Sequence, residues 1–142
     1  MKWITRERAR VDRIACPWLI RRFIDPRAEI HWVPGTDVRS IADELEGIPF
    51  DVPAVDYGHH GDQCSFDAFL PRHGLANDEA LTRLATIIRG ADTGRPELAP
   101  ESAGLAAMAN GFWAMGLPDE ESLRLQSPLY DALYMHCGGD PP

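Results

Sequence analysis

The chain has 142 residues, of which 44% are hydrophobic, and it carries a formal net charge of −8 at pH 7. This length fits one domain with its own core, and no segment approaches the roughly 18 apolar residues that a membrane span requires. Residues 1–27 hold eight Lys or Arg against three Asp or Glu, which gives +5 there and leaves −13 for residues 28–142. An acidic body repels nucleic-acid phosphates, so we expect no direct nucleic-acid binding and no membrane partner.

The three cysteines give little sign of a disulfide framework or a zinc finger. Cys16, Cys64 and Cys137 are odd in number, lie far apart and form no Cys-x-x-Cys pair. The N-terminal sequence also lacks the apolar core of a signal peptide. We therefore expect a soluble, cytoplasmic protein that folds as a single domain over residues 1–142, and assembly into a homo-oligomer stays open.

The first half of the chain mixes strand and helix patterns. A short strand is expected over residues 2–5, and Asp12 is a plausible N-cap for a helix reaching about Ile24. Residues 29–33 alternate like a strand, and residues 37–45 form a short amphipathic helix. Residues 50–57 look extended, but Pro53 interrupts them and favours an edge strand.

From Ser65 onward the pattern becomes helical. Ser65 is expected to cap the first of these helices, which are predicted over residues 66–72, 79–89 and 101–115. A last helix is expected to begin at Ser127-Pro128, after a helical turn that is kinked at Pro128. Together these patterns predict an α+β fold, a helix-rich single domain with a small β-sheet near the N-terminus.

Residues 56–69 gather two histidines, three aspartates and a cysteine into fourteen residues. A metal ion needs imidazole and carboxylate ligands that converge from different elements. Asp92 adds a carboxylate that continues the apolar stripe of the helix at 79–89 toward the interior, where it needs a partner. The candidate ligands of a divalent metal ion of unknown identity are therefore His59, Asp62, Asp67 and Asp92.

These residues also have ordinary structural roles, which stay open. Asp67 can complement the positive end of a helix dipole, and Asp92 can form an ion pair with Arg89 at a helix end. The sequence leaves undecided whether His59 or His60 points into the site.

Other residues suggest different chemistry. Cys64 just precedes a helix, a position that lowers the pKa of a thiol, so a thiol- or metal-dependent redox or detoxifying enzyme with His60 as base is one alternative. Cys64 can equally be a small buried hydrophobe. Arg13 and Arg89 are candidates for binding a tetrahedral oxyanion, because a guanidinium group matches paired oxygens. An interaction module anchored by an exposed tryptophan, without small-molecule chemistry, is the remaining alternative.

Four segments carry a resemblance to a known family. They are VDRIACPWLIRRFIDP at residues 11–26, HGDQCSFDAF at 60–69, RGADT at 89–93 and LYDALY at 129–134. In this order they resemble the C-terminal domain of the ChrB-type chromate resistance proteins. The resemblance implies a cytoplasmic accessory or sensor domain in the stress response to chromate. It also implies a small-anion partner, because chromate is a tetrahedral dianion similar to sulfate.

Longer relatives in this family act as chromate-responsive regulators of a chromate transporter, and they carry an additional N-terminal region associated with DNA binding. Here Met1 lies immediately before the shared domain, so we do not expect a direct role as a transcription factor. The family supplies no agreed catalytic residues. The positions inside or beside the matching segments are Asp12, Arg13, His59 or His60, Cys64, Asp67, Arg89 and Asp92. A polar pocket between the 59–67 turn and the helix end at 89–92 is the resulting expectation.

Overall fold

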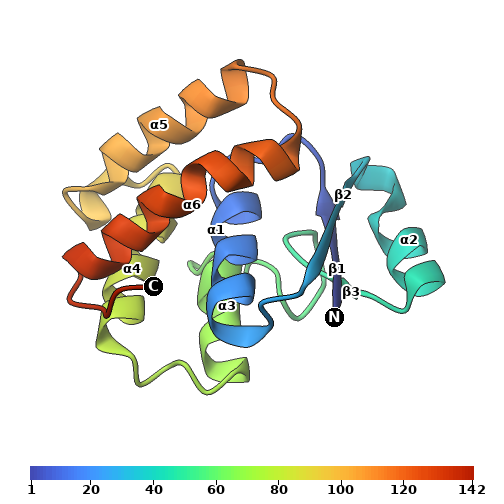
Figure 1. Cartoon of the computed structure of the whole chain (residues 1–142), viewed down its shortest axis with the longest axis horizontal. Coiled ribbons are helices and arrows are strands. Elements are labelled where there is room, and N and C mark those ends of the chain that lie inside the picture. Colours follow the sequence, from blue (N-terminus) through green and yellow to red (C-terminus); the bar gives the residue numbers. More distant parts are fainter.

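The computed structural model describes residues 1–142, and its N-terminal third forms a small parallel sheet (Figure 1). Strands β1 (Lys2–Arg6), β2 (Glu29–Val33) and β3 (Ile48–Pro49) are arranged in the order β2-β1-β3, with both outer strands parallel to β1. Parallel neighbours need a crossover connection. Helix α1 (Asp12–Leu19) with its π-helical continuation (Ile20–Ile24) joins β1 to β2, and helix α2 (Val38–Leu45) joins β2 to β3.

The two crossover helices lie on opposite sides of the sheet (Figure 1). Successive side chains of a strand point to opposite faces. Accordingly Trp3 belongs to the main core, which includes Ile14 and Leu19 of α1, whereas Ile4 packs in a smaller cluster with Val38 and Ala42 of α2. The chain therefore leaves β1 toward one edge of the sheet and later returns to the other edge. In open α/β sheets, ligands bind where the strand order reverses in this way.

The rest of the chain is helical. It forms α3 (Ser65–Arg72), α4 (Glu79–Asp92), α5 (Ser102–Ala114) and α6 (Asp119–His136), with short 3-10 turns at Gly35–Asp37 and Pro96–Leu98. Helix α1 contacts α3, α4 and α6, and α5 packs along α4. The predicted α+β fold, helix-rich with a small N-terminal sheet, is confirmed. No helix combines the length and apolar character that crossing a membrane requires.

Two local predictions at helix starts were wrong. Asp12 is the first residue of α1 and does not cap it; its carboxylate instead accepts the backbone N–H of Ser65 at the start of α3, 2.7 Å away. Cys64 rather than Ser65 is the N-cap of α3, because the Asp67 carboxylate accepts the Cys64 N–H at 3.0 Å. The Ser65 hydroxyl is bonded to Asp51.

Two longer elements also differ from the sequence-based expectation. Helix α6 begins at Asp119 and runs through Pro128, because three acidic residues in its first turn stabilise an earlier start. Residues 50–57 do not form a strand. The edge strand ends at Pro49, and Asp51 and Ala54 adopt left-handed backbone conformations, with φ of 52° and 61°, that turn the chain away from the sheet.

Candidate metal centre

Three carboxylates and one imidazole meet beside the sheet, where the C-terminal ends of β1 and β3 lie. Asp12 begins α1, the element after β1, and Asp51 and His59 lie in the segment after β3. These segments meet because β1 and β3 are adjacent and parallel, so both chains leave the sheet at the same edge. Asp92 is the last residue of α4, and its Oδ1 accepts the backbone N–H of Asp12 at 3.4 Å. Four groups spread over eighty residues thus share one place in the fold.

The side chains of Asp12, His59 and Asp92 are spaced as the ligands of a single ion would be, and Asp51 lies beside His59. His59 Nε2 lies 3.0 Å from Asp92 Oδ2, 3.3 Å from Asp51 Oδ1 and 3.4 Å from Asp12 Oδ2. One ligand atom from each of Asp12, His59 and Asp92 can be chosen so that all three lie within 4.8 Å of one another. Ligand atoms about 2.1 Å from a tetrahedral ion are about 3.4 Å apart, so these separations suit a metal ion.

The carboxylates form the floor of the site and the imidazole lies on its solvent side. The side chain of Asp12 is 0% exposed and that of Asp51 5%, whereas that of His59 is 45% exposed. Asp12 Oδ1 is buried and has no hydrogen-bond partner. A buried polar atom without a partner costs about 1–3 kcal/mol. A cation bound by the Asp12 carboxylate would offset this cost.

The acidic cluster changes the proton affinity of its members. Burial, followed by the charges of Asp12 and Asp51, raises the pKa of Asp92 to about 7. Hydrogen bonds with Asp12 and Asp51 raise the pKa of His59 to about 10, and burial raises the pKa of Asp12. In the metal-free protein the His59 imidazolium therefore supplies the positive charge that the carboxylates require.

The Asp51 carboxylate is held in its charged form by neighbouring hydrogen-bond donors and a guanidinium group. Burial alone would raise the pKa of Asp51, but hydrogen bonds from His59 and Ser65 and the charge of Arg13 together lower it. Ser65 Oγ donates to Asp51 Oδ1 at 2.8 Å, and an Arg13 guanidinium nitrogen lies 3.1 Å from Asp51 Oδ2. A left-handed conformation at a non-glycine residue is strained, and such strain gathers at functional sites. Here it places the Asp51 carboxylate against His59.

A pocket of about 450 Å³ gives solvent access to this centre. It is lined by Arg6, Asp51, Val52, Pro53, Ala54 and His59. Since His59 and Asp51 belong to both the pocket and the cluster, an ion could reach the carboxylates from this side without opening the core.

The predicted metal ligands divide into two groups. His59 and Asp92 lie together, whereas Asp62 and Asp67 are not part of the cluster of ligand atoms. Asp62 is exposed, and the Asp67 carboxylate is occupied by Arg89 at 2.8 Å and by the Cys64 N–H. His59 and Asp92 lie beside Asp12 and Asp51, whereas the pocket of about 410 Å³ between the 59–67 turn and α4 is a different one, with Gln63, Asp67 and Arg89 in its lining.

The remaining candidates have their own partners. Arg13 pairs with Asp51 and Arg89 with Asp67, so both guanidinium groups already contact a carboxylate. His60 Nε2 lies 2.9 Å from the backbone carbonyl of Asp56, and the Cys64 thiol donates to Asp67 instead. Burial raises the pKa of the Cys64 thiol well above its ordinary value, so this thiol is protonated at neutral pH. Of the two adjacent histidines, His59 is the one in the site.

Sequence reasoning missed Asp51, and it named Asp12 as a helix cap and as a position within a matching family segment but not as a metal ligand. The available signal was the alternation of strand and helix over residues 2–49, which is typical of parallel strands with crossover helices. A parallel sheet would have directed attention to the residues that follow each strand, which include Asp12 and Asp51.

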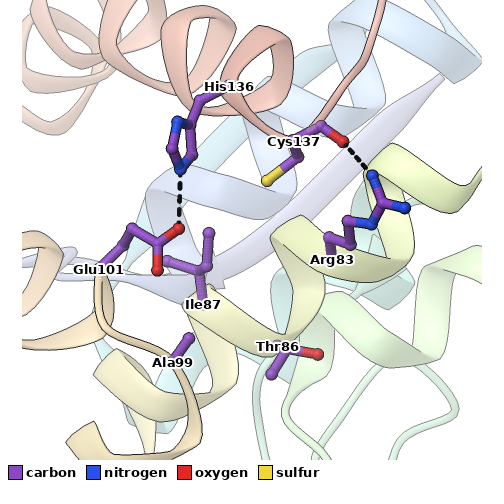
Figure 2. A pocket seen from close by; sticks show the side chains of 7 residues that line it. All are labelled: Arg83, Thr86, Ile87, Ala99, Glu101, His136 and Cys137. Carbon is purple, nitrogen blue, oxygen red and sulfur yellow. Dashed lines mark hydrogen bonds and ion pairs between the residues drawn. The ribbon is translucent and has the colours of Figure 1, made fainter.

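A second pocket shares no residue with this centre (Figure 2). Its polar groups satisfy one another: His136 Nε2 lies 2.8 Å from Glu101, and the Arg83 guanidinium donates to the Cys137 carbonyl at 3.0 Å. It therefore offers no converging set of free ligand groups.

Comparison with known proteins gives one consistent family. Residues 3–137 match the family described as "ChrB, C-terminal domain". The chain is also 39% identical over 136 residues to Protein ChrB of Cupriavidus metallidurans, an alignment that covers 95% of this chain and 40% of that protein. The chain thus spans less than half the length of this curated relative. No solved structure matches the chain.

Proposed function

This chain belongs to the ChrB C-terminal domain family, as the four sequence segments predicted, and we propose that it is a cytoplasmic accessory or sensor domain of a chromate-resistance system that binds a divalent metal ion. Asp12, His59 and Asp92 are the proposed ligands, with Asp51 beside them. The observation that carries the proposal is the convergence of Asp12, His59 and Asp92, which can each offer a ligand atom within 4.8 Å of the other two.

The charge of the site favours a cation over a tetrahedral oxyanion. Three carboxylates surround His59. An anion at Arg13 or Arg89 would have to displace Asp51 or Asp67, and each of these carboxylates is less than 10% exposed. Removing the partner of a buried carboxylate costs about 3–5 kcal/mol. We therefore prefer binding of a metal ion to direct binding of chromate by these arginines as the proposed function.

The donor set narrows the choice of ion. Carboxylates suit Mg²⁺ and Mn²⁺, and an imidazole adds preference for first-row transition metals, so Mn²⁺ and Zn²⁺ are the ions to test first. A bound divalent ion supplies a concentrated positive charge and Lewis acidity. The chain's own part is to hold Asp12 and Asp92 in place and to give up the proton of His59 as the ion binds.

Metal content and affinity test this proposal directly. We expect purified protein loaded with Zn²⁺ or Mn²⁺ to retain about one ion per chain after dialysis, measured by elemental analysis, since the donors form one cluster. Asp12→Asn and Asp92→Asn should each weaken binding in calorimetry by more than the 10–100-fold that indirect supporting contacts are worth. Asp62→Asn is the matched control, because Asp62 is exposed and outside the cluster. Equal binding by the Asp12→Asn/Asp92→Asn double variant, or no binding by the wild type, would rule out this site.

The role in chromate resistance needs a separate test in cells. Disrupting the gene should lower the chromate concentration that the source organism tolerates, and the wild-type gene should restore it. The Asp12→Asn/Asp92→Asn double variant should not restore tolerance if the ion is required, whereas Asp62→Asn should. Unchanged tolerance after disruption would separate this chain from the chromate response.

A further inference from the structure

The pocket beside the candidate metal centre has the size and the lining of a site for a small organic molecule. Its volume of about 450 Å³ lies within the roughly 300–1,000 Å³ that is usual for small-molecule pockets. Its lining combines the polar side chains of Arg6, Asp51 and His59 with the uncharged residues 52–54. Apolar walls with a few polar groups are typical of ligand pockets, so this lining indicates a ligand with a charged end and an apolar part.

Arg6 brings an accessible guanidinium group to this pocket. It is the last residue of β1, and its side chain is 44% exposed. Its Nε donates to the Asp51 backbone carbonyl at 3.2 Å, and its Nη2 lies 3.5 Å from Asp51 Oδ2. The same carboxylate oxygen lies closer to Arg13, at 3.1 Å, and the Arg13 side chain is only 17% exposed. Arg6 is therefore the arginine of this centre that can bind a further anion without displacing Asp51 from its partners.

The segment after β3, which lines the pocket, is fixed by its own backbone. The Asp51 N–H donates to the Tyr57 carbonyl at 2.9 Å and closes the segment on itself. A Cβ atom at Gly58 would lie 2.9 Å from the Val52 carbonyl oxygen, so only glycine allows this close approach. The pocket is thus formed before any ligand enters, and a preformed site lowers the entropic cost of binding.

The charge of this region would favour an anion once a divalent ion is bound. A metal ion is bound by neutral imidazole, so His59 would then add no charge. The ion and Arg13 together balance the three carboxylates Asp12, Asp51 and Asp92. Arg6 adds a positive charge beyond this balance, at the pocket. Without the ion the carboxylates remain and oppose the entry of an anion.

We propose that this pocket binds a small organic carboxylate, whose carboxylate group is held by the Arg6 guanidinium beside the metal centre and whose apolar part lies along residues 52–54. The inference rests on the proposed function and adds a ligand class to it. A guanidinium group matches the paired oxygens of a carboxylate. His59 and Asp51 belong both to the pocket and to the centre, so a ligand in the pocket would lie next to the ion. A site with three protein ligands leaves a coordination position of the ion open for it.

Two arginines of the N-terminal segment form a matched pair of variants. Arg6→Gln removes the positive charge from the pocket, while Asp51 keeps its contact with Arg13. Arg10→Gln is the control, because the Arg10 guanidinium lies over the Trp113 ring, 4.4 Å from its centroid, and does not line the pocket. Neither substitution changes a proposed metal ligand, so both variants should bind Zn²⁺ with the affinity of the wild type when no anion is added.

Benzoate is a suitable probe, since it joins a carboxylate to an apolar ring, and sulfate is the inorganic comparison. We expect calorimetry to show that Zn²⁺-loaded wild type and Arg10→Gln bind benzoate, with sulfate binding more weakly. Arg6→Gln should bind benzoate at least about 10-fold more weakly, because it loses hydrogen bonds between charged groups. Because coupling between two ligands is reciprocal, saturating benzoate should raise the Zn²⁺ affinity of the wild type by about 5-fold or more. Benzoate should also shift the visible absorption bands of the Co²⁺-loaded wild type.

The outcomes separate this inference from the proposed function. A wild type that binds Zn²⁺ but not benzoate, or benzoate binding by Arg6→Gln equal to that of the wild type, would overturn the inference and leave the metal centre standing. Tighter binding of sulfate than of benzoate would overturn the organic ligand class. Benzoate binding of equal strength with and without Zn²⁺ would overturn its place beside the ion. A wild type that binds neither Zn²⁺ nor Co²⁺ would overturn the proposed function and this inference together.

Discussion

Two side chains of the candidate metal centre hold protons more tightly in the folded chain than in the unfolded chain. Burial and the neighbouring Asp12 and Asp51 charges raise the pKa of Asp92 from 3.8 to about 7. Hydrogen bonds with the same two residues raise the pKa of His59 from 6.5 to about 10. In the metal-free centre, protons on Asp92 and His59 thus reduce the repulsion among the carboxylates, and a metal ion would compete with these protons.

These shifts predict how the stability of the metal-free protein depends on pH. Between its unfolded and folded pKa, each group is protonated only in the folded state, so raising the pH favours unfolding. For Asp92 this window runs from 3.8 to about 7, and for His59 from 6.5 to about 10. We expect the free energy of unfolding, measured by urea denaturation with a chelator present, to fall as the pH rises from about 4 to about 10.

A variant separates the two contributions. Asp92→Asn should flatten the decline between pH 4 and 7 and keep the decline above it, because His59 remains. A wild-type stability that is constant or rises over the whole range would contradict the assignment.

At the scale of elements, the contact between α4 and α5 depends on Gly90. A Cβ atom at this position would lie 2.8 Å from Ser102 Cβ and 2.9 Å from the Arg95 carbonyl oxygen. Ser102 also donates its hydroxyl to the Ile87 carbonyl at 2.8 Å, which ties the start of α5 to α4. Gly90 thus allows the close approach that holds the end of α4, and with it Asp92, in place.

Substituting two glycines should have opposite effects on stability. Gly90→Ala should lower the free energy of unfolding by about 1–3 kcal/mol, because the added methyl group overpacks the helix contact. Gly111→Ala, on α5 with no atom within 4 Å of the new Cβ, should raise it by about 0.5–1 kcal/mol, because alanine favours the helix. Urea denaturation at one pH compares the two. Stabilisation by Gly90→Ala as large as that by Gly111→Ala would show that helix propensity, and not the contact, decides.

Elements with strong local signals could be predicted from the sequence. The strand at residues 29–33 and the helices α2 to α5 agree with their predicted ranges within a few residues, because apolar spacing and helix-ending residues are local features. The start of α6 was placed too late because Pro128 is a favourable first helical residue. In the folded chain, however, the acidic first turn from Asp119 starts the helix earlier.

The site could be predicted only where its residues accompany a local signal. His59 and Asp92 were found because one follows an extended segment and the other continues an apolar stripe. Asp51 carries no such signal, since its place depends on the parallel pairing of β3 with β1 and on a left-handed turn directly after β3. Asp12 was read as a cap for its own helix, whereas its carboxylate caps α3, which lies fifty residues further along the chain.

At the scale of the whole molecule, the centre connects the sheet to the helical part. Asp12 belongs to the first crossover helix, Asp51 and His59 to the segment after β3, and Asp92 to the end of α4. An ion bound by these groups would cross-link segments that are otherwise joined by packing and by hydrogen bonds and ion pairs, among them the bonds of the Ser65 N–H to Asp12 and of the Asp12 N–H to Asp92. Ion binding should therefore be coupled to the stability of the whole fold.

This coupling predicts that the unfolding temperature rises when the ion binds. A ligand that binds only the folded state at 100 times its Kd stabilises it by about 2.7 kcal/mol. We expect the unfolding temperature of the wild type to rise with Zn²⁺ or Mn²⁺ and to return on adding a chelator. The Asp12→Asn/Asp92→Asn double variant should show no rise. A wild type that binds the ion in calorimetry without any change in unfolding temperature would mean that the ion does not cross-link the folded chain.

The separation of the ligands along the sequence also fixes when the centre can form. During synthesis Asp12 leaves the ribosome early, while Asp92 follows only after the sheet, α3 and most of α4 have been made. A nascent chain or a truncated product that ends before Asp92 lacks one wall of the site and exposes the other acidic groups. An ion held by all of these groups would therefore bind only after Asp92 has been synthesised, and it would mark a chain whose first ninety-two residues have been completed and folded together.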